Sequence, residues 1–390
     1  MNSKPPILQE THDFSLVLGG PLYQLYLRSH IAQPSLALVH RRILAITLIA
    51  WLPLLLLSAL GGTLAGGAVS VPFLHDIEAH VRFLVALPVL IFAELVVNQR
   101  MVPVVRQFVD RGIIVPEEVP KFHAVIDSAM RLRNSVALEV ALIIAVYTIG
   151  RWAWEDQFAL RTATWFKDSE LTLAGYWYAY VSIPIFQFIL LRWYLRLFIW
   201  FWFLWRVSRL KLRITATHPD RAGGLGFLGD STHMFAPLLF AQGALLAGLI
   251  ASRIFFGEQT LLDFKMEAGV LTVFFIVFIL GPLCVFTPHL ARAKRQGKRE
   301  YGAFAARYVQ GFEEKWIRGS ADEQLMGTGD IQSLADLGNS YEVVRQMRVV
   351  PFGMQAVTGL VVATAAPLLP LALTIMPLEE LVGHLLKIVF

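Results

Sequence analysis

Long apolar runs, separated by shorter polar stretches, follow one another along almost the whole chain. Seven of them reach the roughly 20 residues that an α-helix needs to cross a bilayer. They are residues 42–63, 82–102, 134–154, 175–205, 233–256, 268–289 and 353–376. Because hydrocarbon offers no partners to backbone polar groups, runs of this length are expected to be helical. The pattern predicts an all-α polytopic integral membrane protein.

Two of these runs differ from a simple span. Residues 175–205 are long enough to continue well past the hydrocarbon. Residues 353–376 contain Pro367 and Pro370, and a proline inside a helix removes a backbone hydrogen bond. The last run therefore either spans with a kink or re-enters on the same side.

Polar insertions interrupt the predicted transmembrane domain, residues 42–376. They are residues 103–133, 206–232 and 290–352. Gly112 and Pro116 in the first are typical of one helix ending and another beginning. The third carries aromatic residues three or four positions apart, as on one helix face: Tyr301, Phe304, Tyr308, Phe312 and Trp316. Asp330 suits the N-cap of a following helix, which Pro351 ends. We expect helical hairpins that form a compact cytoplasmic helical layer beneath the membrane.

The two ends of the chain lie outside the predicted spans. Residues 1–41 predict a cytoplasmic amphipathic segment on the membrane surface, broken at Gly19-Gly20. The first apolar run begins too late for a cleavable signal peptide, so it is expected to anchor the chain. Residues 377–390 are expected to form an extracytoplasmic tail.

Lysine and arginine are distributed unevenly between alternate loops. The N-terminal side and the loops after the second, fourth and sixth runs carry 25 of the 34 basic residues, and the opposite side carries seven. Cytoplasmic loops carry such an excess, which predicts a cytoplasmic N-terminus and an extracytoplasmic C-terminus. The short loops and basic bias favour a bacterial inner membrane. Basic loops facing anionic lipid headgroups explain the net charge of +5 without a nucleic-acid partner.

Composition excludes an ordinary soluble protein. Hydrophobic residues make up 56% of the chain and charged residues only 16%, with a mean hydropathy of +0.57. A water-covered protein of this length needs more polar surface. Cys284 is the only cysteine in the sequence, so neither an intrachain disulfide nor a thiol metal cluster can form. No metal and no cofactor is expected.

Ionisable residues inside the apolar runs are the main functional candidates, because burying charge in hydrocarbon is costly. At about 1.5 Å per helical residue, Glu139 and Arg192 lie at similar depth and could pair, with Arg196 one turn further along. No basic residue shares the estimated depth of Glu94, so this carboxyl is expected to be unpaired and able to bind a proton or cation. Asn98, one turn away, could donate a hydrogen bond to it.

Two interpretations of these residues remain open. The charged cluster could be structural and orient the helices, with a protonated Glu94 as a packing residue. Alternatively, the same side chains could line or support an ion or substrate pathway.

The end of the fourth run is unusually aromatic. Six of the eight residues 198–205 are aromatic, and they include Trp200, Trp202 and Trp205. Such a stretch requires an apolar or interfacial environment, which could be a subunit interface, a lipid contact or a hydrophobic constriction.

The loop after the fourth run combines polar residues with glycines. It formally contains GxGxxG, but a dinucleotide site needs a preceding strand and a βαβ unit, which are not expected here. Possible members of a ligand or metal site are His218, Asp220, Arg221, Gly223 and Gly224. The alternative is a plain turn, since Pro219 and Asp220 favour turns and glycine permits close backbone approach.

The leading functional hypothesis is transport of ions or small solutes, by a homo-oligomeric channel-like assembly in the lipid bilayer. HExxH, GxSxG and P-loop motifs are all absent, so an enzyme is the less favoured class. The alternatives are a membrane-embedded enzyme that acts on a lipid-linked or cytoplasmic substrate through His218 and Asp220, and a scaffold or assembly factor that uses the hairpins for docking.

Overall fold

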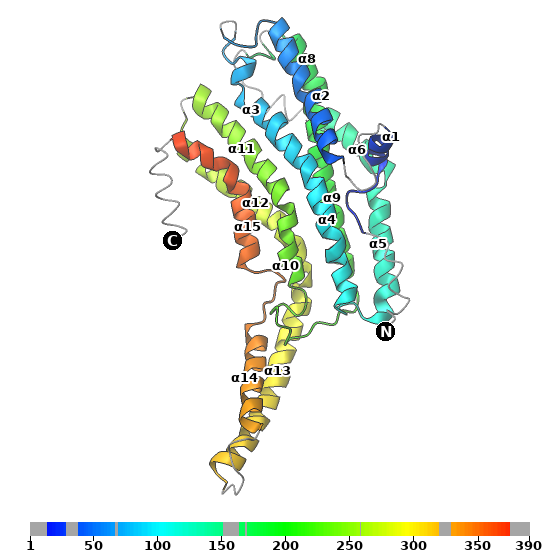
Figure 1. The fold of residues 1–390 in the computed structure, drawn as a ribbon, viewed down its shortest axis with the longest axis vertical. Coiled ribbons are helices and arrows are strands. Elements are labelled where there is room, and N and C mark those ends of the chain that lie inside the picture. Colours follow the sequence, from blue (N-terminus) through cyan, green and yellow to red (C-terminus); the bar gives the residue numbers. More distant parts are fainter. Residues whose placement is uncertain are drawn as a thin grey trace.

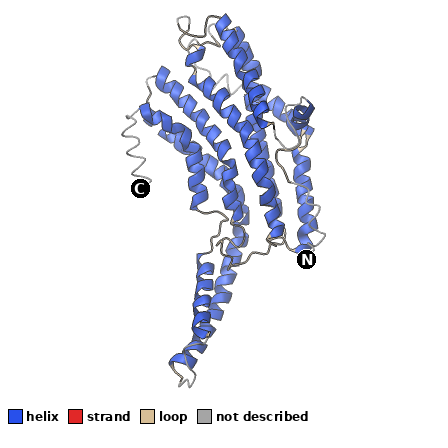
Figure 2. Ribbon diagram, in the orientation of Figure 1, coloured by secondary structure: helices blue, strands red, loops and turns tan. Residues whose placement is uncertain are grey.

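A computed structural model describes residues 14–28, 38–66, 69–150, 164–167, 170–257, 259–319 and 329–374. Every regular element in these ranges is a helix, and β-pairing is limited to isolated bridges (Figures 1 and 2). Six helices of the described chain are long and apolar enough to cross a membrane, or seven if a bent pair counts as one span. The fold is that of an all-α multi-pass membrane protein, as the apolar runs predict.

The six long helices are Val39–Leu60, Ile77–Asp110, Leu173–Val207, Phe227–Phe256, Leu261–Ile317 and Met354–Thr374. Their main elements are α2 (Val39–Leu60), α3 (Ile77–His80), α4 (Leu87–Asp110), α8 (Leu173–Trp177), α9 (Ile183–Val207), α10 (Phe227–Ser231), α11 (Ala236–Phe256), α12 (Lys265–Leu280), α13 (Thr287–Phe312) and α15 (Met354–Ala365). Single turns of π- or 3₁₀-helix join the paired elements. Most of these helices are longer than the apolar runs because polar turns extend them.

The third apolar run belongs to the bent pair. Helix α5 (Val119–Arg133) and the helix from α6 (Val136–Ala145) to Gly150 meet at 43°. Ser135 adopts an extended conformation there, and its hydroxyl accepts a hydrogen bond from the backbone N–H of Leu138, which starts α6 anew. The end of this run lies outside the described residues. The predicted turn at Gly112, with a φ of +63°, does separate α4 from α5.

The third insertion forms a projecting hairpin and not the compact layer expected. Helix α13 continues from α12 and leaves the bundle, and α14 (Asp330–Gln346) returns beside it (Figure 1). The Asp330 carboxylate does not cap α14 but accepts a hydrogen bond from the Trp316 indole at 2.9 Å. Helix α14 packs along α13 and leaves part of the aromatic face exposed; Phe304 is 50% exposed.

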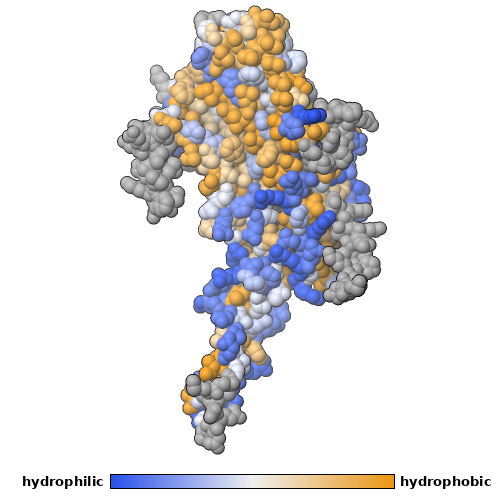
Figure 3. All heavy atoms as spheres, in the orientation of Figure 1, coloured by the Kyte–Doolittle hydropathy of each residue, from blue (hydrophilic) through white to orange (hydrophobic). Residues whose placement is uncertain are grey.

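The surface divides into two halves. The half of the bundle away from the hairpin is mainly apolar, whereas the hairpin and the adjoining end of the bundle are mainly hydrophilic (Figure 3). Large apolar side chains on α2 and α12, among them Leu44, Leu56, Val270 and Val277, are more than half exposed. Such a surface suits contact with lipid.

Helices α4, α9 and α11 form the centre of the bundle. Their fully buried residues include Leu90, Phe203 and Leu239. Helix α11 also packs closely on α15, because a Cβ on Gly243 would lie 2.0 Å from the carbonyl oxygen of Thr364. Glycine is therefore required for this approach. Two of the central helices, α4 and α9, carry three of the five charged side chains described next.

Candidate functional site: a buried charged layer

Five charged side chains meet inside the bundle, and we call them the buried charged layer. They are Arg42 of α2, Glu94 of α4, Glu139 of α6, and Arg192 and Arg196 of α9. Each is at most 8% exposed. The layer therefore brings together four of the five pathway candidates that sequence analysis identified. It also contains Arg42, which sequence analysis did not identify as a candidate.

Glu94 is shared by two arginines. One carboxylate oxygen lies 2.5 Å from Nη2 of Arg42, and the other lies 2.6 Å from Nη2 of Arg196. The expectation of an unpaired carboxyl was wrong. The depth estimate compared backbone positions along straight helices, whereas a guanidinium reaches several ångströms from its own Cα. Arg42 is also the first residue of its apolar run, which places its backbone at the membrane edge.

Glu139 pairs with Arg192, as their similar depths predict. The distance from Oε1 of Glu139 to Nη2 of Arg192 is 3.4 Å. The other carboxylate oxygen accepts a hydrogen bond of 2.9 Å from the backbone N–H of Leu22. Gly20 lets the chain come this close, since a Cβ there would lie 3.0 Å from Glu139. Arg192 and Arg196 are thus one turn apart on α9 but bind different carboxylates.

Among the described residues, the layer brings together three guanidinium groups and two carboxylates, so its formal charge balance is positive. The Arg196 guanidinium carbon lies 4.9 Å from the centre of the Trp193 ring, within the range of a cation–π contact. The Trp193 indole in turn donates a hydrogen bond of 2.9 Å to the Leu90 carbonyl. Nη1 of Arg196 is buried without a hydrogen-bond partner. This arrangement leaves a donor available to an incoming acceptor.

The start of the described chain covers the layer on the side facing the hairpin. Phe14 is only 2% exposed and packs on Phe203 and Trp200, with ring centres 4.6 and 6.0 Å away. The Ser15 hydroxyl donates to the Asn98 side-chain oxygen at 2.5 Å. The Asn98 side chain therefore hydrogen-bonds to this segment, whereas the sequence suggested a hydrogen bond to Glu94.

This placement of residues 14–20 was not foreseen. The described part of the predicted surface segment enters the bundle, where Arg133 donates a hydrogen bond to the Ser15 carbonyl. The sequence signal was the Gly19-Gly20 break. Both glycines have positive φ, +145° and +87°, and they turn the chain from the buried stretch into α1 (Pro21–Arg28).

The aromatic end of α9 divides between core and surface. Trp200 is buried and lies against Phe14. Trp205 is 39% exposed, and the Arg209 guanidinium lies 5.1 Å from its ring centre. Trp202 is half-buried beside Arg206. Of these three tryptophans, only Trp200 lies in the interior of the bundle, where a hydrophobic constriction would have to be.

The polar loop folds as a tight turn around Asp220. The carboxylate accepts hydrogen bonds from three backbone N–H groups, those of Ala222, Gly224 and Gly226, at 2.8, 3.1 and 2.8 Å. Nδ1 of His218 lies 2.9 Å from the same carboxylate. Arg221, Gly223 and Gly224 have φ values of +53°, +65° and +96°. The candidate ligand residues are thus close together in space. The Asp220 carboxylate, however, already accepts hydrogen bonds from backbone N–H groups of its own loop.

The turn also holds the segment between α14 and α15 in place. Arg348 donates a hydrogen bond of 2.9 Å to the Asp220 carbonyl, and the Arg348 N–H donates to the Arg221 carbonyl at 2.6 Å. No group of three or more His, Cys, Asp or Glu residues within the described ranges is arranged to hold a metal ion. These contacts favour the turn interpretation of the loop over the ligand site.

The turn gives a pH-dependent prediction. Burial raises the pKa of Asp220, but the N–H groups of Ala222, Gly226 and Gly224 outweigh it and hold the pKa below its ordinary value. Ionised Asp220 therefore stabilises the fold above the ordinary carboxyl pKa of about 3.9, and this contribution is lost as the pH falls through the lowered value. We expect Asp220→Asn to lower the melting temperature by several degrees near neutrality, with the difference shrinking in acid.

Melting curves of both proteins from about pH 7 to about pH 3 measure this difference. Asp230→Asn, at an exposed position of α10, is the matched control and should leave the curves unchanged. A constant difference between wild type and Asp220→Asn over the whole range would contradict the role assigned to the carboxylate.

No protein-family model, curated protein or solved structure matches the chain. The functional argument therefore depends on the buried charged layer and its surroundings.

Proposed function

We propose that this protein moves ions or small solutes across a membrane, and that the buried charged layer forms part of the pathway. The layer itself is the observation that supports this most. Apolar residues of similar volume could often replace a buried ion pair at equal or better stability. Charged side chains inside an apolar bundle are therefore better explained by work on a charged or polar solute than by helix packing alone.

The charge balance favours an anion. Glu94 and Glu139 balance two of the three arginines, and Nη1 of Arg196 is an available buried donor. Guanidinium groups are well suited to bind anions because they present several N–H donors in one plane. A solute anion that passes the layer would restore its neutrality.

The proposal includes an orientation and a location. Basic residues of the loops gather at the hairpin end of the bundle, for example Arg209, Arg213, Arg295 and Arg299. By the positive-inside rule this end, with the N-terminus, would face the cytoplasm of a bacterial cell, and the C-terminus would lie outside. The apolar exposed sides of α2 and α12 leave room for homo-oligomeric contacts as well as for lipid.

The enzyme alternative receives less support from the geometry. It assigned the chemistry to His218 and Asp220, whose carboxylate accepts three hydrogen bonds from its own loop. A general base or metal ligand needs free lone pairs at its oxygens. The projecting α13–α14 hairpin leaves a scaffold role open as a second use of the same protein.

Flux through purified protein in liposomes tests the transport proposal. Chloride, nitrate, sodium and potassium would be compared with a mock-purified control. We expect anion flux above the control and a decrease of about tenfold or more in Arg192→Ala, since a hydrogen bond to a charged group contributes about 1.5–3 kcal/mol. Glu94→Gln should also change the flux, because it alters the charge of the same layer.

Glu267→Gln, an exposed substitution on α12, is the matched control and should transport like wild type. All variants must elute as folded protein before flux is compared. Unchanged flux in both Arg192→Ala and Glu94→Gln would remove the layer from the pathway. Flux equal to the mock control in folded wild-type protein would reject transport itself.

A further inference from the structure

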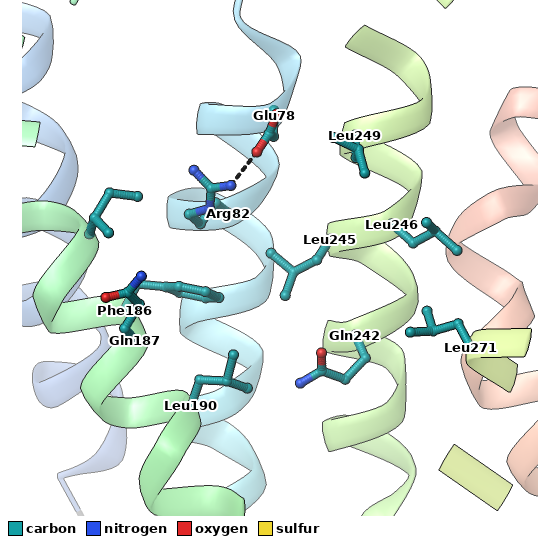
Figure 4. A pocket seen from close by; sticks show the side chains of 11 residues that line it. Glu78, Arg82, Phe186, Gln187, Leu190, Gln242, Leu245, Leu246, Leu249 and Leu271 are labelled. Carbon is teal, nitrogen blue, oxygen red and sulfur yellow. Dashed lines mark hydrogen bonds and ion pairs between the residues drawn. The ribbon is translucent and has the colours of Figure 1, made fainter. Parts of the chain in front are cut away.

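A cavity of about 340 Å³ is lined by residues of α9, α11 and α12 and by Glu78 and Arg82 of the helix Ile77–Asp110 (Figure 4). Helix α3, which carries Glu78, lies at the end of the bundle away from the hairpin (Figure 1). Its walls are mostly leucine side chains, those of Leu190, Leu245, Leu246, Leu249 and Leu271. This volume falls within the range of sites for small molecules. An apolar molecule would gain from leaving water or lipid for such walls, provided that its polar atoms find partners.

Most polar groups around the cavity already have partners. Arg82 pairs with Glu78 and donates a hydrogen bond of 2.6 Å to the Tyr178 hydroxyl. This pair, drawn in Figure 4, carries no net charge. The Gln187 amide donates to the Gly150 carbonyl at 3.0 Å. A charged ligand would therefore find no counter-charge here.

Gln242 is the exception. Its side chain extends from α11 into the space opposite α9 (Figure 4), and the residue is only 7% exposed. Its Nε2 atom is buried and interacts with the Tyr194 hydroxyl, but this contact does not reach good hydrogen-bond geometry, so the donor is only partly satisfied. A buried donor whose hydrogen bond is incomplete costs folding free energy. A ligand oxygen that accepts this hydrogen bond would recover that cost.

We infer that this cavity binds a neutral, mostly apolar molecule with a carbonyl-type oxygen, and that Gln242 donates a hydrogen bond to that oxygen. The leucine walls select for apolar carbon, and the neutral Glu78–Arg82 pair selects against charge. The single available donor selects for an acceptor oxygen. Because the walls belong to the apolar half of the protein, the ligand reaches the site from the bilayer.

The site is separate from the buried charged layer. None of the five residues of the layer lines the cavity. Leu190 borders the cavity, and Arg192, two positions further along α9, lies about 200° around the same helix. The inference therefore does not depend on the transport proposal. Substitutions at the cavity and at the layer can be tested independently.

Benzophenone is a suitable probe, because it is neutral, has one carbonyl and couples to nearby C–H bonds under light. Purified protein would be irradiated with increasing probe, and adducts located by peptide mass spectrometry. We expect saturable labelling of the peptides that carry Leu245, Leu246 and Leu190. Diphenylmethane, which has the same rings but no carbonyl, should compete about three- to tenfold more weakly, as one lost hydrogen bond predicts.

Two variants and one control separate this site from general labelling. Leu245→Trp fills the cavity and should abolish the saturable adducts. Gln242→Leu should retain labelling but make unlabelled benzophenone and diphenylmethane equal competitors. Leu262→Trp, at a position that is 63% exposed, should behave as wild type. Labelling that does not saturate, or a carbonyl preference that persists in Gln242→Leu, would overturn the inference.

Discussion

Replacing Glu94 with leucine is expected to lower the free energy of unfolding by about 3–5 kcal/mol, because it leaves buried guanidinium groups without their carboxylate. The side chains of Arg42 and Arg196 both end on this carboxylate, at 2.5 and 2.6 Å. Neither guanidinium can turn to water, since Arg42 is 1% and Arg196 4% exposed. Denaturant or thermal unfolding in detergent, followed by circular dichroism, measures the loss.

The lost stability should return when the arginines left without a carboxylate are also replaced by apolar residues. In the triple variant with Arg42→Met, Glu94→Leu and Arg196→Met, the same volume is apolar, and we expect most of the lost stability to return. Glu267→Gln is the control, with an expected change close to zero. A single variant as stable as wild type, or a triple variant less stable than Glu94→Leu alone, would contradict the charge-pairing account.

Replacing Phe14 with alanine is expected to lower the free energy of unfolding by about 3–5 kcal/mol, the usual range for a buried phenylalanine. Its ring packs against both Phe203 and Trp200, which also stack on each other. The loss should loosen residues 14–20, so hydrogen exchange should accelerate there and at the Leu22 N–H that binds Glu139. Unfolding and hydrogen-exchange mass spectrometry together report the effect.

Phe304→Ala, at a half-exposed position on α13, should change the free energy of unfolding much less. If the buried charged layer belongs to a transport pathway, Phe14→Ala should also increase flux, because residues 14–20 cover the layer on the hairpin side. An effect of Phe14→Ala no larger than that of Phe304→Ala would show that the segment is not packed as described.

The sequence predicts the membrane helices well because their physics is local. A run of about 20 apolar residues is recognisable without knowing its neighbours. The same holds for the α4–α5 turn, where Gly112 adopts positive φ as expected. The pairing of Glu139 with Arg192 was predicted from their similar depths alone. The prediction holds because their helices also pack side by side.

Other features depend on contacts that no local pattern contains. The reach of the Arg42 side chain to Glu94 depends on how α2 is tilted against α4. Residues 14–20 show no helical or strand periodicity, so their burial could not be predicted. The direction of the α13–α14 hairpin depends on the continuation of α13 out of the bundle. The cavity beside Gln242 exists only once four of the long helices are in place.

The helix from Leu261 to Ile317 has a mechanical consequence. It contains 57 residues, and at about 1.5 Å per residue this corresponds to a rod of roughly 85 Å. One part of the rod lies among the apolar helices and the other forms the hairpin. At that length, a tilt of about 5° within the bundle would swing the far tip by roughly 7 Å. A partner that binds the tip and displaces it would therefore also shift the helices that line the cavity beside Gln242. Conversely, a molecule bound in the cavity would change the position of the tip.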